Sequence, residues 1–185
     1  MAALVWPLTT VIVVFALRKS ITALVPKIEE FNLGSLRMKI KQEIAEAKEL
    51  AKEVNAQLEG EALEKSHATD TVSAESARKR QLASLAPEAA ILAQWTEVEY
   101  VLKQLAEQES LNPRSPLSKI LEQLVRAEVV DIQSAKLFKT LRVVRNEVAH
   151  TPAERIGLDT YFALDYLRSA DTLLESLRAV LGQGS

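Results

Sequence analysis

The chain has 185 residues, of which 48% are hydrophobic, so it is long enough to bury the core of one domain of ordinary size. Its formal net charge of −2 excludes a general nucleic-acid coat protein, because such binding depends on neutralising many phosphates at once, although a local basic site is still compatible with this charge. The absence of cysteine excludes disulfides, thiolate catalysis and cysteine-ligated metals. Only five glycines and six prolines, with few strand-like runs, indicate an all-α protein.

The N-terminal stretch predicts a membrane anchor over residues 1–26. Residues 2–17 read AALVWPLTTVIVVFAL and carry no charged side chain. A helix of that length covers about 25 Å, slightly less than the ~30 Å hydrocarbon core of a bilayer, and Arg18 and Lys19 follow with side chains long enough to reach the headgroups. These cations place the rest of the chain on the cytoplasmic side. A secretory signal peptide has its cations before the apolar run, so the remaining alternative is a buried helix of a soluble protein.

Residues 27–60 combine a basic segment with a charged helix. From residue 36 to 41, apolar and basic side chains alternate, which suits either a short strand or a basic strip on anionic lipid. Beyond this segment, apolar residues recur every three or four positions and draw a narrow, alanine-rich stripe along a helix. Such a stripe needs a partner, and two interpretations stay open: a coiled coil between chains, or a solvated single helix with Glu/Lys pairs. The stripe consists of Ile40, Ile44, Ala47, Ala51, Val54 and Leu58.

Residues 61–84 predict a flexible linker. They are rich in Ala, Ser, Thr and charged residues and show no sustained apolar period. His67 lies in this stretch without a second ligand residue at metal-binding spacing, so we expect no metal site there.

Residues 85–185 predict four amphipathic helices with short connections. Pro87 stands at the start of the first helix, where its missing N–H costs nothing. Asp131 has the form of an N-cap of the third helix, which ends at Thr151 because a residue before proline is disfavoured in the helical region. Four such helices pack most simply as an antiparallel bundle. The apolar stripe of the third helix consists of Ile132, Ala135, Leu137, Phe138, Leu141, Val144 and Val148.

The end of this third helix carries the motif with functional content. Residues 141–150 read LRVVRNEVAH, so Arg145 is followed by Asn146 and, four positions later, by His150. This pattern resembles the hallmark of the HEPN superfamily, an arginine followed by a polar residue and then by a histidine. Residues 87–91 and 95–99 also resemble the membrane-anchored bacterial branch of that superfamily, much of which is known only as a domain of unknown function. The resemblance covers roughly residues 85–181.

The resemblance implies a metal-independent ribonuclease that works as a dimer and needs no cofactor. His150 would be the acid or base, Arg145 the phosphate clamp and Asn146 an orienting amide, roles that suit an imidazole and a guanidinium. Arg142 would add charge to the same cleft, and Glu99 fits the family's additional polar position, with Glu97 as the alternative. Such proteins act in toxin–antitoxin or anti-phage systems, which implies a bacterial inner-membrane location and an antitoxin or sensor partner.

Helical geometry limits how Arg145 and His150 could form one site. Arg145 lies about 140° around the helix from His150 at 100° per residue, so two protomers related by a twofold axis would be needed to bring the two groups together. Two non-catalytic alternatives stay open: an RNA- or nucleotide-binding or signalling module, and a membrane-tethered structural oligomer. Asn and His near a helix end also often bond only the terminal carbonyls. The aromatic residues at helical spacing are expected in the core rather than stacked on bases, namely Trp95, Phe138, Tyr161 and Phe162.

Overall fold

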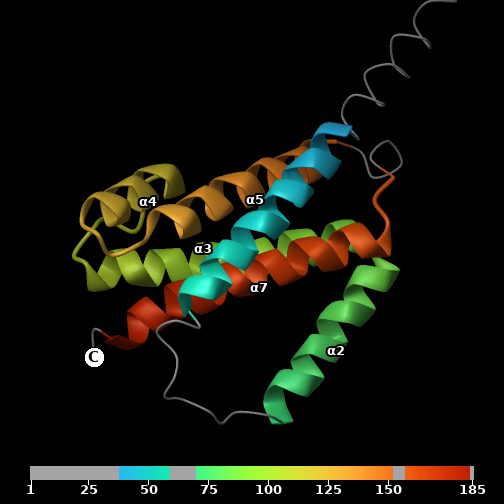
Figure 1. Cartoon of the computed structure of the whole chain (residues 1–185), viewed down its shortest axis with the longest axis horizontal. Helices are drawn as coiled ribbons and strands as arrows, with labels where there is room; N and C mark the ends of the chain where they lie inside the picture. The colour runs from blue at the N-terminus through green and yellow to red at the C-terminus, as the bar shows by residue number, and fades with distance from the viewer. Residues whose placement is uncertain (1–37, 59–69, 152–156, 184–185) are drawn as a thin grey trace, which may run out of the picture. The chain divides into compact units, whose positions relative to one another are not determined.

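The computed structural model describes residues 38–58, 70–151 and 157–183. Within these ranges the chain forms six helices and no strands, which confirms the all-α prediction. They comprise a helix over residues 38–58, α2 (Asp70–Leu85), α3 (Pro87–Gln108), α4 (Leu117–Arg126), α5 (Ile132–His150) and α7 (Thr160–Gln183), shown in Figure 1. The helical bundle described below belongs to one compact unit, which begins at residue 40.

The predicted membrane anchor, residues 1–26, lies outside the described residues. No helix in the described ranges is long and apolar enough to cross a bilayer. The strand interpretation of the alternating segment is wrong from residue 38 onward, because residues 38–41 begin a helix. Ile40 is 2% exposed and starts the apolar stripe, whereas Lys39 and Lys41 are exposed. The three- and four-residue spacing that begins at Ile40 therefore decides the local structure.

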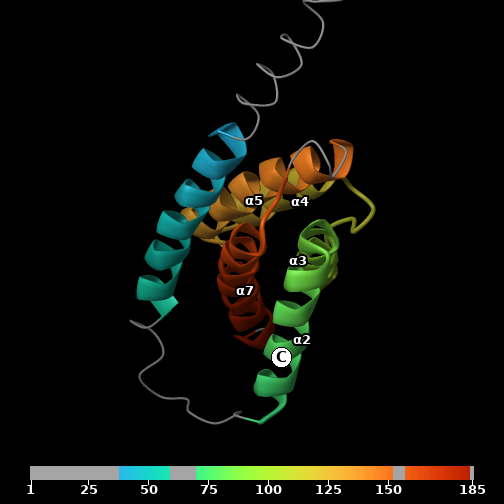
Figure 2. The same cartoon turned by 90° about the vertical axis from the view of Figure 1, so that its right-hand side faces the viewer.

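Helix α7 lies at the centre of the bundle. In Figure 2 it runs through the middle, with the helix over residues 38–58 on one side, α2 and α3 on the other, and α5 above it. Because α7 has neighbours on several sides, its buried side chains recur from Ala163 to Leu177. A buried hydrogen bond of 2.8 Å joins the hydroxyls of Ser176 on α7 and Ser134 on α5. The buried apolar side chains of α7 are Ala163, Tyr166, Leu167, Ala170, Leu173, Leu174 and Leu177.

Helices α3, α5 and α7 form the long framework around that centre. The colours of Figure 1 show that α3 and α7 run in one direction and α5 in the opposite direction, with the shorter α4 at one end. The prediction of an antiparallel four-helix bundle is therefore wrong for α3 and α7, which pack against each other in parallel. Pro87 occupies the first turn of α3, as predicted. The predicted N-cap of α5 is also confirmed: the Asp131 carboxylate accepts from the backbone N–H groups of Gln133 and Ser134, both at 2.8 Å. Helix α5 ends at His150, and Thr151 is extended.

The four aromatic residues predicted for the core divide into two groups. Trp95 and Phe138 are 2% and 1% exposed, and their ring centroids lie 4.9 Å apart. Phe162 is half-buried, and Tyr161 is 80% exposed, so the core prediction is wrong for Tyr161. Tyr161 stands in the first turn of α7, about 140° around the helix from the buried Tyr166, and therefore points to the solvent side.

The apolar stripe of residues 40–58 finds its partner within the same chain. Figures 1 and 2 show this helix beside α5 and α7. Lys48 Nζ lies 2.9 Å from Asp165 Oδ2 of α7. Since the stripe is covered by the bundle, neither a coiled coil between chains nor a solvated single helix describes it. Of the stripe, Ile40, Ile44, Ala47, Ala51 and Val54 are buried and Leu58 is half-buried; Leu50, beside the stripe, is buried as well.

The prediction of a flexible linker over residues 61–84 is wrong for residues 70–84, which form most of α2. Residues 61–69 lie outside the described ranges. From residue 75 onward, Ala83 is the one buried side chain of α2, so apolar spacing could not reveal this helix. Its attachment is polar instead: Lys79 Nζ lies 2.9 Å from Asp171 Oδ1 of α7 and 3.6 Å from Glu97 Oε2 of α3.

The surroundings of Lys79 keep it charged. Burial on its own lowers the pKa of this ammonium, but the hydrogen bond to Asp171 and the charges of Asp171, Glu97 and Glu75 outweigh burial and raise the pKa above 10.5. A raised pKa in the folded state means that the stabilisation is complete below the ordinary pKa. It is lost only as the pH rises through the raised value, so the attachment of α2 is at full strength near neutrality.

We predict that Lys79→Met loosens α2. The substitution keeps the apolar stem but removes the charge, so the opening free energy of α2 should fall by about 1–3 kcal/mol. Backbone hydrogen exchange measures this opening. The matched control is Lys52→Met, because Lys52 pairs with Glu49 at 2.7 Å on an exposed surface, where such pairs contribute little. Equal exchange of α2 amides in both variants would refute a polar attachment.

Candidate functional site

Four of the predicted site residues, Arg142, Arg145, Asn146 and His150, lie in the C-terminal half of α5, and Arg145 approaches Glu99 of α3. Arg145 Nη2 is 3.9 Å from Glu99 Oε1, and the two side chains are 33% and 28% exposed. Glu97, the alternative to Glu99, lies elsewhere, where it pairs with Lys79 and Arg178 at 3.6 and 3.9 Å. The structure therefore brings Glu99 to Arg145.

The position of Glu99 is fixed from the core. The indole Nε1–H of Trp95, one helical turn earlier on α3, donates to Glu99 Oε1 at 2.6 Å. Trp95 is almost fully buried and packs against Phe138 of α5, so it has little freedom to move. The carboxylate that faces Arg145 is thus held by a rigid aromatic side chain. The apolar spacing of α3 predicts only a core position for Trp95; the four-residue spacing of Trp95 and Glu99 is the sequence signal for their contact.

The guanidinium of Arg145 has unused hydrogen-bonding capacity. Its Nη1 donates to Asn146 Oδ1 at 3.2 Å, whereas the 3.9 Å separation from Glu99 exceeds hydrogen-bonding distance. Its Nε is buried and has no hydrogen-bond partner among the described residues. Since arginine has five N–H donors, most of this capacity is free. The buried Nε without a partner costs about 1–3 kcal/mol, whereas the side chain as a whole is 33% exposed, so the Nη groups are the donors that an anion could reach.

Tyr166 of α7 lies near the same arginine but does not fit an acid/base role. Its hydroxyl donates to the backbone carbonyl of Leu141 at 3.4 Å, a long bond. Burial raises the pKa of this phenol strongly, and the positive charge of Arg145 acts in the opposite direction with a smaller effect. The phenol is therefore neutral at physiological pH and lies as a buried, uncharged side chain near the guanidinium.

His150 lies apart from this cluster. It is the last residue of α5 and is exposed, while Asn146 and Arg142 are half-buried. No hydrogen bond or ion pair joins His150 to Arg145 in the described part of the chain. This separation agrees with the 140° between the two positions on the helix. A single copy of the chain therefore presents the guanidinium and the imidazole on different sides of α5.

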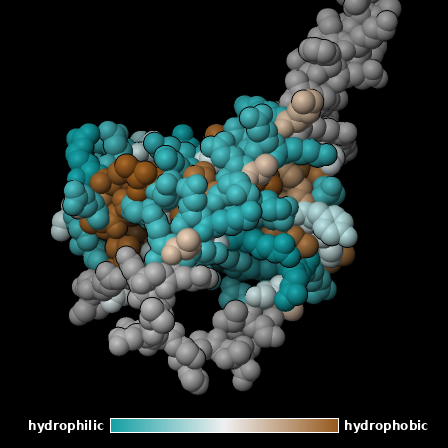
Figure 3. Space-filling view, in the orientation of Figure 1, coloured by the Kyte–Doolittle hydropathy of each residue, from teal (hydrophilic) through white to brown (hydrophobic). Residues whose placement is uncertain are grey.

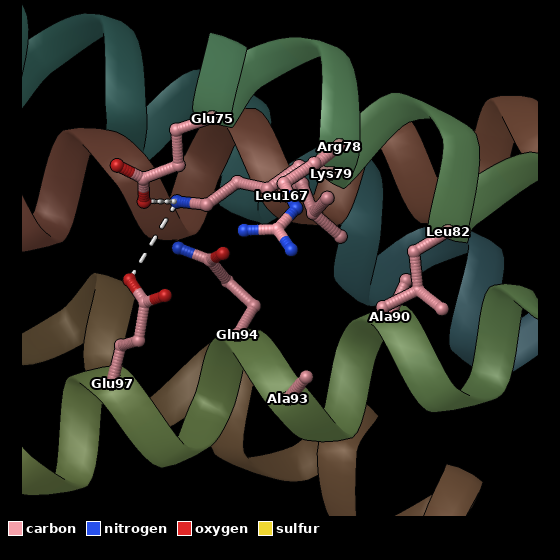
Figure 4. A pocket seen from close by; sticks show the side chains of 9 residues that line it. All are labelled: Glu75, Arg78, Lys79, Leu82, Ala90, Ala93, Gln94, Glu97 and Leu167. Carbon is pink, nitrogen blue, oxygen red and sulfur yellow. Dashed lines mark ion pairs between the residues drawn. The ribbon is translucent and has the colours of Figure 1, made fainter. Parts of the chain in front are cut away.

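A groove of about 560 Å³ lies between α2, α3 and α7 (Figure 4). The Lys79 ammonium stands within it, 3.4 Å from Glu75 Oε1, and the Gln94 amide N–H donates to Asp171 Oδ1 at 2.8 Å. Figure 4 shows the Arg78 side chain beside the groove. Most of the polar groups that line the groove pair with one another. They are the groups that attach α2 to α3 and α7. The described residues include no group of three or more His, Asp or Glu side chains that could hold a metal ion.

Comparisons of the chain with known protein families, with curated proteins and with solved structures give no match. The residues themselves, and their geometry, are therefore the basis for a functional proposal.

We predict that the Trp95–Glu99 hydrogen bond stabilises the fold. Glu99→Ala leaves the buried indole N–H without an acceptor and should lower the free energy of unfolding by about 1–3 kcal/mol. Glu99→Gln keeps an acceptor and should recover most of this loss. Urea denaturation provides the measurement, and Glu122→Ala serves as the control, because Glu122 forms an exposed pair with Arg126. Equal stability of Glu99→Ala and Glu122→Ala would contradict the positioning of Glu99 by Trp95.

Proposed function

We propose that the chain is a HEPN-like protein, anchored in the bacterial inner membrane by residues 1–26, whose α5 end forms a metal-independent endoribonuclease site. In this proposal α3, α4, α5 and α7 correspond to the four helices of the HEPN domain. The observation that carries it is the underpaired guanidinium of Arg145, held beside α5 by Glu99 and Asn146 in the helix that ends in the exposed His150. A toxin or anti-phage role, with an antitoxin or sensor as partner, follows from the resemblance.

The chemistry needs three functions that these residues supply. The RNA 2′-oxygen loses its proton to a base and attacks the adjacent phosphorus. The bond from phosphorus to the 5′-oxygen then breaks, and that oxygen takes up a proton, leaving a 2′,3′-cyclic phosphate and a 5′-hydroxyl. The imidazole of His150 suits the proton transfers because its ordinary pKa lies near neutrality. The guanidinium of Arg145 suits the charge that develops on the phosphorane, and Asn146 orients that guanidinium.

The proposal requires two copies of the chain. Because Arg145 and His150 face different sides of α5, one protomer offers an incomplete site. A twofold axis near the end of α5 would set the arginine of one protomer against the histidine of its partner. We therefore propose a homodimer, or a larger oligomer built from it, as the active form.

The second candidate is a non-catalytic RNA- or nucleotide-binding or signalling module. The contact between Arg145 and Glu99 favours it, because a carboxylate 3.9 Å away partly neutralises the guanidinium. Such an arginine still binds a phosphate but stabilises a phosphorane less well. A purely structural membrane-tethered oligomer is disfavoured, since the stripe of residues 40–58 on which a coiled coil would depend is buried in its own bundle.

We predict that the full chain, solubilised in detergent, cuts single-stranded RNA in the presence of EDTA. His150→Ala should lower the cleavage rate at least about 100-fold, because it removes a general acid or base. The matched control is His67→Ala, which removes the chain's other histidine and should cut at the wild-type rate. A gel assay with end-labelled RNA measures both.

The outcomes separate the candidates. Full cutting by His150→Ala would end the ribonuclease proposal. Saturable RNA binding that Arg145→Ala weakens, with no product from the wild-type chain, would support the binding module instead. A chain that neither cuts nor binds RNA would leave nucleotide binding, signalling and the structural alternative.

A further inference from the structure

Helix α5 carries a concentration of positive charge in an acidic protein. It contains four Lys or Arg residues and one Glu, a net charge of +3, whereas the whole chain has −2. The remainder of the chain therefore carries −5. A cationic helix in an anionic protein is the kind of charge asymmetry that marks a polyanion-binding surface.

These charges share a face with the candidate site. At 100° per residue, Asn146 and His150 each lie within about 20° of Lys139 around the helix, and Lys136 and Arg142 lie about 60° to either side. Burial agrees with this geometry, because Lys136, Lys139 and His150 are exposed while Arg142 and Asn146 are half-buried. We call these five residues the basic face of α5. Along the helix axis they extend over about 21 Å.

The cations of the basic face are not neutralised within the protein. Among the described residues, no ion pair involves Lys136, Lys139 or Arg142. Elsewhere in the described residues some cations are paired, as Lys48 is with Asp165 at 2.9 Å and Arg126 with Glu122 at 3.0 Å, while others such as Lys103 and Lys119 are not. The basic face differs in that its cations lie together on one side of one helix. Three unpaired cations, followed on the same line by an amide and an imidazole, provide charge and hydrogen-bond donors for successive phosphates.

We infer that the basic face of α5 binds the phosphate backbone of single-stranded RNA lengthwise and leads the strand to His150. A helix that lies on a membrane needs a wide apolar surface to insert, and this face offers only the half-buried Val143 and, one turn before Lys136, the exposed Ile132, so RNA fits better than lipid. The inference rests on the proposed function for the reaction at His150. Binding along the helix does not itself require cleavage.

The test is RNA affinity measured without turnover. The full chain in detergent is titrated into a fluorescent single-stranded RNA with 2′-O-methyl riboses, which no attack by a 2′-hydroxyl can cleave. The double variant Lys136→Ala/Lys139→Ala should bind at least about tenfold more weakly at low salt. The slope of log affinity against log salt concentration should become shallower by about 1.4, because two phosphate contacts are lost at ~0.7 each.

The control removes the same charge elsewhere. Lys48→Ala/Lys52→Ala takes away two lysines that pair with Asp165 and Glu49, and it should bind RNA like the wild type. Equal affinity and equal salt slope in the two double variants would overturn the inference. Loss of binding to phosphatidylglycerol micelles with RNA affinity unchanged would assign the face to lipid and would overturn it as well.

Failure of the two proposals can be told apart. If the uncleavable RNA binds through Lys136 and Lys139 while wild-type chain cuts no RNA, the basic face stands and the ribonuclease proposal fails. If ordinary RNA is cut in a His150-dependent manner while the two lysines do not affect affinity, the ribonuclease stands and the lengthwise binding fails.

Discussion

The candidate site depends on one hydrogen bond, from the buried indole of Trp95 to the carboxylate of Glu99. Trp95 is immobilised by the core, so Glu99 is held at a fixed place on α3, and Arg145 on α5 is drawn toward it without a close hydrogen bond. The guanidinium is thereby oriented while most of its donors stay free. An arginine held in this way is preorganised for an anion, since little of its side-chain freedom is left to lose when the anion binds.

Much of the fold follows from the sequence because apolar spacing and caps determine helices that bury a stripe. The stripes of α3 and α5 and the Asp131 cap illustrate this. Helix α2 could not be predicted in this way, because its attachment depends on ion pairs between Lys79 and carboxylates distant in sequence. Such pairs leave no apolar periodicity in the sequence. The partner of the 40–58 stripe could not be predicted either. An apolar stripe indicates that a packing partner is needed, but whether that partner belongs to the same chain depends on tertiary packing. Figure 3 shows that the face covered by the helix of residues 38–58 has a mostly hydrophilic surface.

The site could be predicted in part. The motif places Arg145, Asn146 and His150 at the end of one helix, and the helical period already separates the arginine from the histidine. Three-dimensional packing was needed to choose Glu99 over Glu97, to give Trp95 a polar role and to show that Arg145 Nε has no partner. The lack of ion pairs along the basic face likewise depends on which side chains surround α5. The sequence of α5 alone does not predict this.

NMR of the Arg145 guanidinium would show whether this side chain binds phosphate. The Nη–H resonances of Arg145, assigned by their loss in Arg145→Lys, report hydrogen bonding at the end of the guanidinium. On titration with uncleavable RNA, we predict a downfield shift of these resonances and slower exchange with water, because Nη donors gain phosphate oxygens as acceptors. Unchanged Arg145 resonances at saturating RNA, with shifts confined to other side chains, would show that Arg145 does not bind phosphate.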